Sequence, residues 1–223
     1  MLNDALRDVP HISLLGTTGI LFEAPGLFDL ETQRRIWSLA REAAGWEGIR
    51  EAAPGMTTLL LTFSAPFREI DALKARLEQA WENAEPDHRQ GKLVEVPVIY
   101  GGEYGPDLEA VAQAKGLDID DVVDIHTAGV YPVFALGSHP GFGYLGALDP
   151  RIHMPRKKVP ILRAEAGSVA IGGMQTGVSS TAGPSGWNII GRTEKRLFDE
   201  QRDPPAMLEP GDTIRFTAQR VQK

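Results

Sequence analysis

The chain has 223 residues, of which 42% are hydrophobic and 24% are charged, a balance typical of folded globular proteins and not of disordered ones. Its 23 Lys and Arg residues against 30 Asp and Glu give a net charge of −7, which argues against general binding to nucleic acid or to anionic membranes. It has no cysteine, which excludes disulfides, thiolate nucleophiles and cysteine-based zinc or iron–sulfur sites.

The N-terminal segment carries no recognisable targeting signal. Residues 1–8 have neither the basic region nor the apolar core of a secretory signal peptide. No apolar run in the chain approaches the roughly 18 residues of a membrane span. We therefore expect a soluble cytoplasmic protein with no membrane contact.

Residues 1–100 are predicted to form a ferredoxin-like α+β domain with the element order β-α-β-β-α-β. Asp29 is the expected N-cap of a first helix that ends at Gly45, and a second helix over 70–81 carries one apolar stripe that would face a sheet. Pro54-Gly55 is a turn signal that predicts a hairpin. The extended segments of this domain are 12–22, 49–53, 57–63 and 93–100.

Residues 101–223 have a different character, because 17 of the 24 glycines lie there. Such a glycine content is typical of strands joined by tight turns, or of backbone that approaches a ligand closely. Two short helices, from Pro106 to Gly116 and from Asp118 to His126, come first. The strands expected after them are 130–136, 168–171, 187–191 and 213–218, a pattern that predicts a β-barrel or sandwich.

The acidic residues of the two short helices allow two interpretations. Asp120, Asp121 and Asp124 with His126 would suit a hard cation, whereas acids near a helix start more commonly complement the helix dipole. The histidines of the chain also lack metal-binding spacings such as H-E-x-x-H. We therefore expect no metal site, and the negative charge of this helix pair argues against DNA binding.

The run Gly141-Phe142-Gly143-Tyr144-Leu145-Gly146 matches the dinucleotide pattern G-x-G-x-x-G. Asp149-Pro150 interrupts any helix that would meet the pyrophosphate, and the chain contains no P-loop motif. A nucleotide would therefore have to be held in another way or by a partner.

Residues 151–163 include five Arg or Lys residues and no acid, next to this glycine-rich loop. Arg151, Arg156 and Arg163 are candidates for binding a carboxylate or a phosphate, because the guanidinium group offers two parallel hydrogen bonds to such anions. The alternative is a solvated charged face without a ligand.

His139 is the first candidate for acid–base work, because it lies in a loop rich in glycine and proline, and loops on rigid scaffolds often carry function. His126 is a second candidate for the same role. Gln175 would present its amide to a ligand or bond a neighbouring strand, and Trp187 would form a substrate platform or belong to the core. The residues expected to line the site in the glycine-rich loop are Gly141, Phe142 and Tyr144.

Several motifs occur in a fixed order along the chain: IHT at 125–127, YPVF at 131–134, GSHPGFGYLG at 137–146, PR at 155–156, AGSVAIGGMQTG at 166–177 and GWNIIGRT at 186–193. Together they resemble the family of 5-oxoprolinase B subunits, also called PxpB or KipI, whose domain is known as allophanate hydrolase subunit 1. The resemblance covers nearly the whole chain. It implies a ferredoxin-like N-terminal domain and a cyclophilin-like β-barrel C-terminal domain.

The resemblance also implies an activity. The A, B and C subunits of 5-oxoprolinase together cleave 5-oxo-L-proline to L-glutamate with ATP and water. The A and C subunits are therefore the expected partners, and ATP, with or without Mg²⁺, would be bound by the complex. We expect no activity from this chain alone. In such a reaction the arginines would face the developing phosphoryl charge and His139 would pass a proton to the ring nitrogen.

Three other functions stay open at this point. Related domains form the carboxyltransferase part of urea carboxylase. In the first alternative, this chain therefore belongs to an enzyme that acts on another small amide or urea such as allophanate. Some family members resemble a KipI-type inhibitor of a sporulation histidine kinase, which is a binding module. Prolyl isomerisation is suggested by the barrel type alone, and fold does not fix chemistry.

Overall fold

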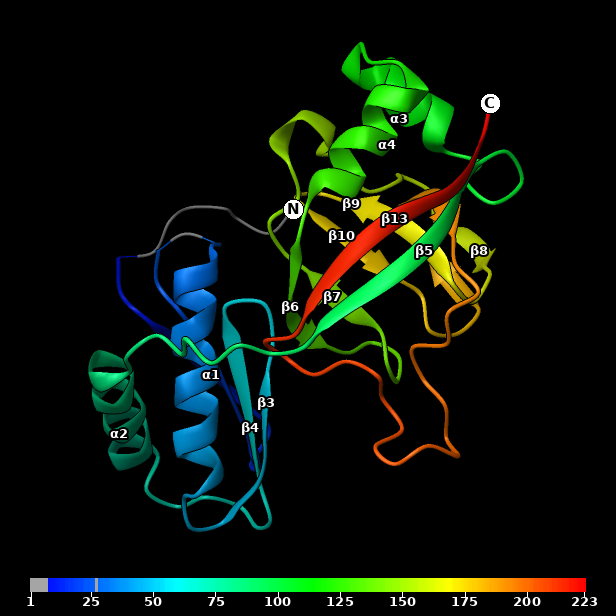
Figure 1. The fold of residues 1–223 in the computed structure, drawn as a ribbon. Helices are drawn as coiled ribbons and strands as arrows, with labels where there is room; N and C mark the ends of the chain where they lie inside the picture. Colours follow the sequence, from blue (N-terminus) through cyan, green and yellow to red (C-terminus); the bar gives the residue numbers. More distant parts are fainter. Residues whose placement is uncertain (1–7, 27) are drawn as a thin grey trace. The chain divides into compact units, whose positions relative to one another are not determined.

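The computed structural model of the chain describes residues 8–26 and 28–223. The chain divides into two compact units, residues 1–89 and residues 90–223 (Figure 1). The division comes earlier than the predicted boundary at residue 100, because the strand over 93–101 belongs to the second unit. The part of the chain that the structure describes contains no helix long and apolar enough to cross a membrane.

The first unit is a four-stranded antiparallel sheet in the order β1-β2-β4-β3, with two helices. Alternate strand residues such as Ile20, Phe22 and Leu61 turn one sheet face toward the helices and form the core with them. The elements are β1 (His11–Leu15), β2 (Gly19–Glu23), α1 (Leu30–Ala44), β3 (Ile49–Pro54), β4 (Thr58–Phe63) and α2 (Ile70–Asn83).

The two predicted ends of the first helix, α1, are confirmed. Asp29 caps α1, since its carboxylate accepts a hydrogen bond of 2.7 Å from the backbone N–H of Thr32, and Gly45 closes the helix. The hairpin around Pro54-Gly55 is confirmed as the β3–β4 pair.

Two strand predictions for this unit are wrong. The segment 12–22 is a hairpin of two strands, β1 and β2, and not one strand. The segment 93–100 does not close the N-terminal sheet but lies in the barrel of the second unit. An alternating pattern shows only that one face of a strand is buried, and long-range pairing decides which sheet receives it.

The second unit is a closed barrel of seven strands in the order β10-β7-β6-β13-β5-β12-β9. The two long strands β5 and β13 pair in parallel, and the other pairs are antiparallel. The barrel strands are β5 (Leu93–Gly101), β6 (Tyr131–Leu136), β7 (Gly143–Leu145), β9 (Ser168–Gly172), β10 (Gln175–Val178), β12 (Asn188–Arg192) and β13 (Thr213–Gln222).

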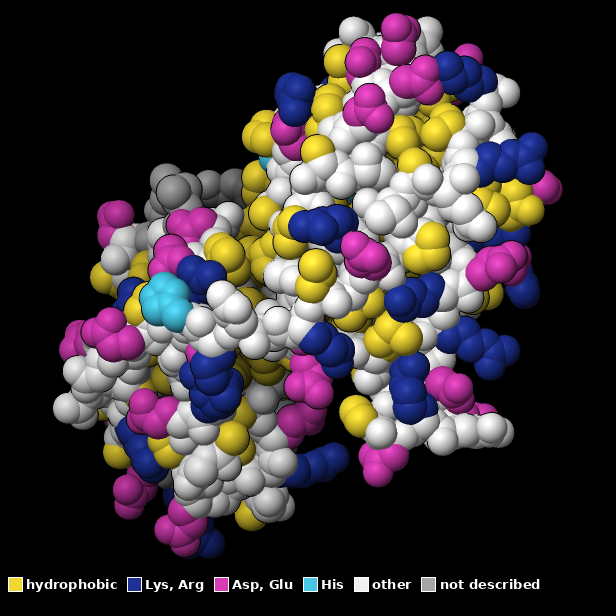
Figure 2. All heavy atoms as spheres, in the orientation of Figure 1, with side chains coloured by type: hydrophobic (Ala, Val, Ile, Leu, Met, Phe, Trp, Pro, Cys, Tyr) yellow, Lys and Arg dark blue, Asp and Glu magenta, His cyan; other side chains and the backbone are white. Residues whose placement is uncertain are grey.

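Helices α3 (Leu108–Lys115) and α4 (Ile119–Ala128) follow β5 and join the barrel core through apolar residues such as Val111 and Val122. Their acids lie on the outside, where Figure 2 shows Asp and Glu gathered over these helices. Asp118 and Asp121 form a capping box at the start of α4. These acids cap the helix or face solvent, whereas the side chain of His126 is buried in the core. The three aspartates and His126, considered above as ligands of a hard cation, therefore do not face one another.

A small sheet of two strands, β8 (Ile161–Ala164) and β11 (Gly183–Ser185), lies beside the barrel. Residues 151–163, here called the basic segment, begin in the short 3₁₀ helix η1 (Pro150–Ile152) and end within β8. This small sheet and the basic segment border the candidate site.

Candidate functional site

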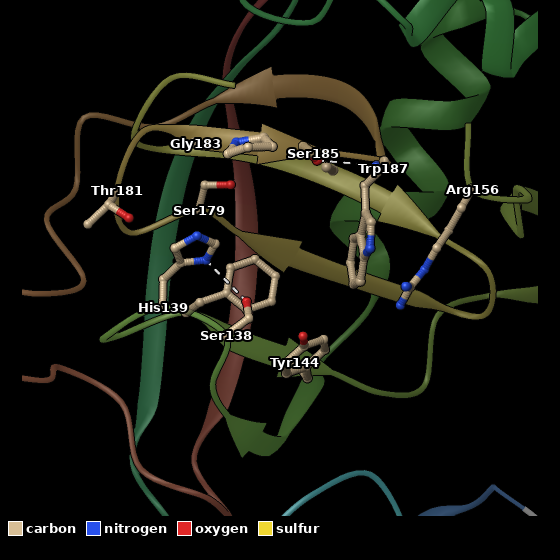
Figure 3. Close-up of a pocket in the computed structure, with 13 residues that line it drawn as sticks. Ser138, His139, Tyr144, Arg156, Ser179, Thr181, Gly183, Ser185 and Trp187 are labelled. Atoms are coloured by element: carbon tan, nitrogen blue, oxygen red, sulfur yellow. Dashed lines mark hydrogen bonds between the residues drawn. The ribbon is translucent and has the colours of Figure 1, made fainter. Parts of the chain in front are cut away.

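A pocket of about 150 Å³ opens on the second unit between the glycine-rich loop, the basic segment and the β11 segment (Figure 3). Five residues predicted from sequence come together in it, although they are spread over almost fifty positions from His139 to Trp187. The lining residues are Ser138, His139, Phe142, Tyr144, Arg156, Ala170, Ser179, Thr181, Gly183, Pro184, Ser185, Gly186 and Trp187.

Three aromatic rings form one wall of the pocket. Phe142 contacts Tyr144 edge-on with 4.9 Å between ring centroids, and Trp187 lies 5.9 Å from Phe142 and 6.1 Å from Tyr144. The side chain of Trp187 is almost fully buried, and its backbone N–H donates to Ser185 Oγ at 3.2 Å. Such interlocking rings present a rigid apolar surface suited to the flat face of a small ring.

Arg156 lies at the Trp187 end of the pocket (Figure 3). Its guanidinium carbon lies 5.6 Å from the centre of the Trp187 ring, within the range of a cation–π contact. Arg156 is exposed, and no acidic partner pairs with it among residues 8–26 and 28–223. Its charge is therefore available to an anionic ligand.

His139 lies at the other end of the pocket, beside Ser138 and Ser179 (Figure 3). Ser138 Oγ lies 3.1 Å from His139 Nδ1, and a Cβ placed on Gly183 would be 3.4 Å from His139 Nε2. The loop is tied by a hydrogen bond from Phe142 N–H to the His139 carbonyl and by one from Ser180 Oγ to the Pro140 carbonyl. The imidazole thus has one nitrogen at a hydroxyl and the other facing the β11 segment.

The other predicted arginines do not reach the pocket. Arg151 pairs with Asp149 at 2.7 Å, and this hydrogen bond lowers the pKa of Asp149 to about 2. Arg163 pairs with Glu165 at 2.9 Å on the exposed strand β8. The basic segment is consequently not one continuous anion site, because two of its arginines have carboxylate partners from nearby acids and Arg156 alone among the three lines the pocket.

Gly141 and Gln175 also lie outside the pocket lining. Gly141 has a φ of 77°, and a Cβ there would approach Phe198 Cβ to 2.6 Å, so the residue shapes the loop that carries His139. Gln175 begins β10 and pairs with Gly172 of β9. Its backbone therefore belongs to the barrel sheet, and its side chain does not line this pocket.

The structure places His126 in the barrel core and not with His139, contrary to the sequence expectation of a second acid–base residue. The side chain is fully buried and stacks on Phe216 at 4.5 Å between ring centroids. Tyr100 Oη lies 2.7 Å from Nδ1, and Thr176 Oγ1 lies 2.9 Å from Nε2. Burial lowers the pKa of His126 to about 3, so the group is neutral near pH 7.

Sequence reasoning missed the segment that closes the pocket opposite the glycine-rich loop. This segment, 179–186, consists of small or hydroxyl-bearing residues and resembles an ordinary turn in the sequence. The one signal that could have identified it is the Gly-Pro-Ser run at 183–185, since glycine allows backbone to approach a ligand closely. In the described ranges, no three potential ligand side chains come together to hold a metal ion. The missed lining residues are Ser138, Ala170, Ser179, Thr181, Gly183, Pro184, Ser185 and Gly186.

Comparison with known proteins gives a family and a fold. Residues 10–208 match the family of carboxyltransferase domains, subdomains C and D. The B subunit of the 5-oxoprolinase of Escherichia coli O157:H7 is 42% identical over 208 residues, which cover 93% of this chain and 95% of that protein. The crystal structure of TTHA0988 is similar with a TM-score of 0.76 and 31% identity, and the match covers 92% of this chain but only 40% of that one.

The Kluyveromyces lactis urea carboxylase has the same fold over 94% of this chain and 22% of its own, with a TM-score of 0.79 and 22% identity. This likeness concerns the fold alone. The family match and the identity to a curated relative, both over most of the chain, agree with the motifs that surround the pocket. This chain belongs to the family of 5-oxoprolinase B subunits, which are built on carboxyltransferase-type domains.

Proposed function

We propose that this chain is the B subunit of a cytoplasmic, ATP-dependent complex that cleaves 5-oxo-L-proline to L-glutamate. The observation that carries the proposal is a pocket with the Arg156 guanidinium at one end, the His139 imidazole at the other and an aromatic wall between them. The substrate is a five-membered lactam with one carboxylate. A volume of about 150 Å³ suits a molecule of this class, since cavities of that size hold benzene.

Each end of the pocket has a chemical task in this reaction. Arg156 binds the substrate carboxylate, and the wall of Phe142, Tyr144 and Trp187 holds the ring. A lactam is a resonance-stabilised amide and a poor electrophile. Transfer of a phosphoryl group from ATP to the amide oxygen weakens that resonance. Water then attacks the carbonyl carbon and the carbon–nitrogen bond breaks, which leaves a glutamyl phosphate, and a second water hydrolyses this acyl phosphate to glutamate and phosphate.

His139 donates the proton that the ring nitrogen needs when the carbon–nitrogen bond breaks. Its Nε2 faces the pocket side that carries Gly183, and Ser138 Oγ contacts Nδ1 and orients the ring. The nitrogen leaves as the free amine of glutamate. Without this proton the leaving group would be an amide anion, which is far less stable.

ATP and its Mg²⁺ are held by the rest of the complex in this proposal. The pocket is too small for a nucleotide in addition to the lactam, and the sequence lacks a P-loop. The partners are the A and C subunits. Support comes from the name of the curated relatives, which denotes one subunit of an enzyme, and from TTHA0988, of which this chain spans only 40%.

The finer fold assignments belong to the same proposal. A cyclophilin-like barrel is supported by the closed seven-stranded barrel of the second unit. A ferredoxin-like first unit is supported by two helices that cover one face of an antiparallel sheet.

A second candidate function is inhibition of a histidine kinase, which needs an exposed apolar surface and no reaction. Val159 and Leu162, which follow Arg156 in the chain, favour it because their side chains are 80% and 90% exposed. The same residues would equally suit contact with a partner subunit, so they do not outweigh the pocket.

The experiment that tests the proposal measures glutamate release from 5-oxo-L-proline by the purified chain alone and by the chain assembled with its cognate A and C subunits. We expect release only in the assembled mixture and only with ATP. Assembly is verified by size-exclusion chromatography. A demonstrably assembled complex that releases no glutamate would contradict the proposal and would shift the test to other small amides and to kinase binding.

A further inference from the structure

The segment that carries Arg156 is bonded to the barrel on both sides of that residue. On one side, the amide nitrogen of Asn188 donates to the Pro155 carbonyl at 2.9 Å and to the Ile171 carbonyl at 3.1 Å. On the other side, Lys157 N–H donates to the Gly186 carbonyl at 2.7 Å. The backbone of Arg156 is thus fixed next to the strand that begins directly after Trp187.

One carboxylate strengthens this attachment. Asp107, at the start of α3, contacts Lys157 Nζ at 2.7 Å through Oδ1, and its Oδ2 accepts a hydrogen bond of 2.7 Å from Ile189 N–H. The two side chains of the ion pair are only 22% and 17% exposed. The nearby pair of Arg163 and Glu165 is 71% and 52% exposed, and such pairs contribute little to stability.

The pairing also neutralises the cation that directly follows Arg156 in the chain. The charge of Lys157 is paired with Asp107, whereas Arg156 has no acidic partner in the described ranges and lines the pocket. A long side chain binds an anion well only when its position is restricted in advance, because ordering it on binding costs free energy. Fixing the backbone on both sides reduces that cost.

We propose that Asp107 is a positioning residue, which holds Arg156 over Trp187 through Lys157 so that the guanidinium is preorganised for the substrate carboxylate. The proposal rests on the function proposed above. It goes beyond it by giving a role to a residue that lies outside the pocket lining.

The test uses the assembled complex with Asp107→Asn, which keeps an oxygen for Ile189 N–H but removes the charge that holds Lys157. We expect the KM for 5-oxo-L-proline to rise about tenfold while kcat stays within about twofold. Lys157→Met, which breaks the same pair from the other side, should give the same split. Glu165→Gln is the matched control, since it breaks an ion pair in the same region that does not hold Arg156, and its KM should be unchanged.

A double-mutant cycle separates positioning from general damage. In an Arg156→Gln background, Asp107→Asn should add no further rise in KM, because Asp107 acts only through Arg156. An equal rise in both backgrounds, or an unchanged KM in the single variant, would overturn the proposal.

A readout without turnover keeps this test independent of the enzymatic proposal. The Nε–Hε resonance of Arg156, identified by its absence in Arg156→Gln, senses the Trp187 ring in the intact chain. We expect Asp107→Asn to move that resonance and Glu165→Gln to leave it in place. If the wild-type complex proves inactive, the proposed function fails, and an unmoved resonance would overturn the positioning role separately.

Discussion

Tyr100 and His126 face each other inside the barrel, with the Tyr100 hydroxyl 2.7 Å from His126 Nδ1. Thr176 Oγ1 donates to the Ala170 carbonyl at 3.1 Å and therefore accepts from His126 Nε2. The imidazole thus carries its proton on Nε2, and Nδ1 accepts from Tyr100. Both nitrogens are satisfied in the neutral form, so the network and the burial together oppose protonation.

This arrangement predicts acid sensitivity of the fold. The pKa of His126 falls from 6.5 to about 3 on burial, so the unfolded chain takes up a proton that the folded chain refuses between these values. Above about pH 6.5 the neutral His126 costs the folded state nothing. As the pH falls from 6.5 toward 3, the free energy of unfolding decreases by about 1.4 kcal/mol per pH unit, because only the unfolded chain binds the proton. Urea unfolding at several pH values between 7 and 4 measures it.

The matched variants for this measurement are His126→Gln and Tyr100→Phe. His126→Gln should lack that share of the pH dependence, whereas Tyr100→Phe should keep it because the buried imidazole remains. Identical pH slopes in the wild type and in His126→Gln would show that His126 is not the sensor.

His139→Ala should lower kcat of the assembled complex by about 100-fold, the lower end of the usual range for losing a general acid. The loop is held by backbone and Ser180 hydrogen bonds that do not use the imidazole, so assembly and melting temperature should stay near the wild type. His88→Ala is the control, because His88 is exposed in the first unit, far along the chain from the pocket. Full turnover by His139→Ala would remove it from the mechanism.

Arg156→Gln should raise the KM for 5-oxo-L-proline by about 30-fold, the cost of losing a charged hydrogen-bonding partner of about 2 kcal/mol. Arg151→Gln and Arg163→Gln provide matched controls, since both remove an arginine from the same segment but break only local pairs with Asp149 and Glu165. Steady-state kinetics of the three variants distinguishes one anion-binding arginine from a diffuse basic patch. Equal effects in all three would favour the patch.

The sequence was most informative where chemistry is concentrated in a few residues. His139, Arg156 and Trp187 could be selected because a histidine in a glycine-rich loop, an arginine in a basic segment and an aromatic residue each suggest a role, and the structure brings them to one pocket. Pairing of the other arginines with Asp149 and Glu165 depends on acids just outside the basic segment. Residue type alone therefore did not distinguish Arg156, which lines the pocket, from Arg151 and Arg163, which do not.

Burial and strand partners could not be read from local pattern. His126 and His139 are the same residue type, and only the fold shows that one lies on the inner face of α4 while the other lies in a surface loop. Likewise, the alternation in β5 is satisfied by any sheet with one buried face, so its parallel pairing with β13, more than a hundred residues later, was not predictable. The wrong assignment of that strand also moved the predicted domain boundary.

The backbone of Gly172 lies directly against the Trp187 ring of the pocket wall. A Cβ at this position would lie 2.5 Å from Cδ2 and 2.7 Å from Cε2 of the Trp187 indole, so Gly172→Ala must displace the ring. We expect a loss of about 2 kcal/mol in the free energy of unfolding, as for other overpacked sites, together with a raised KM because the wall moves. Gly137→Ala is the control, since among the described residues no atom beyond Gly137 and its two chain neighbours lies within 4 Å of the added Cβ.

The clash itself is tested by removing its partner. In a Trp187→Leu background, Gly172→Ala should cost clearly less stability than in the wild type, because a smaller side chain leaves room for the methyl group. Urea unfolding of the four proteins in this cycle gives the coupling. Strict additivity would mean that Gly172 is needed for backbone reasons unrelated to Trp187, and the close approach would then not be what fixes the aromatic wall.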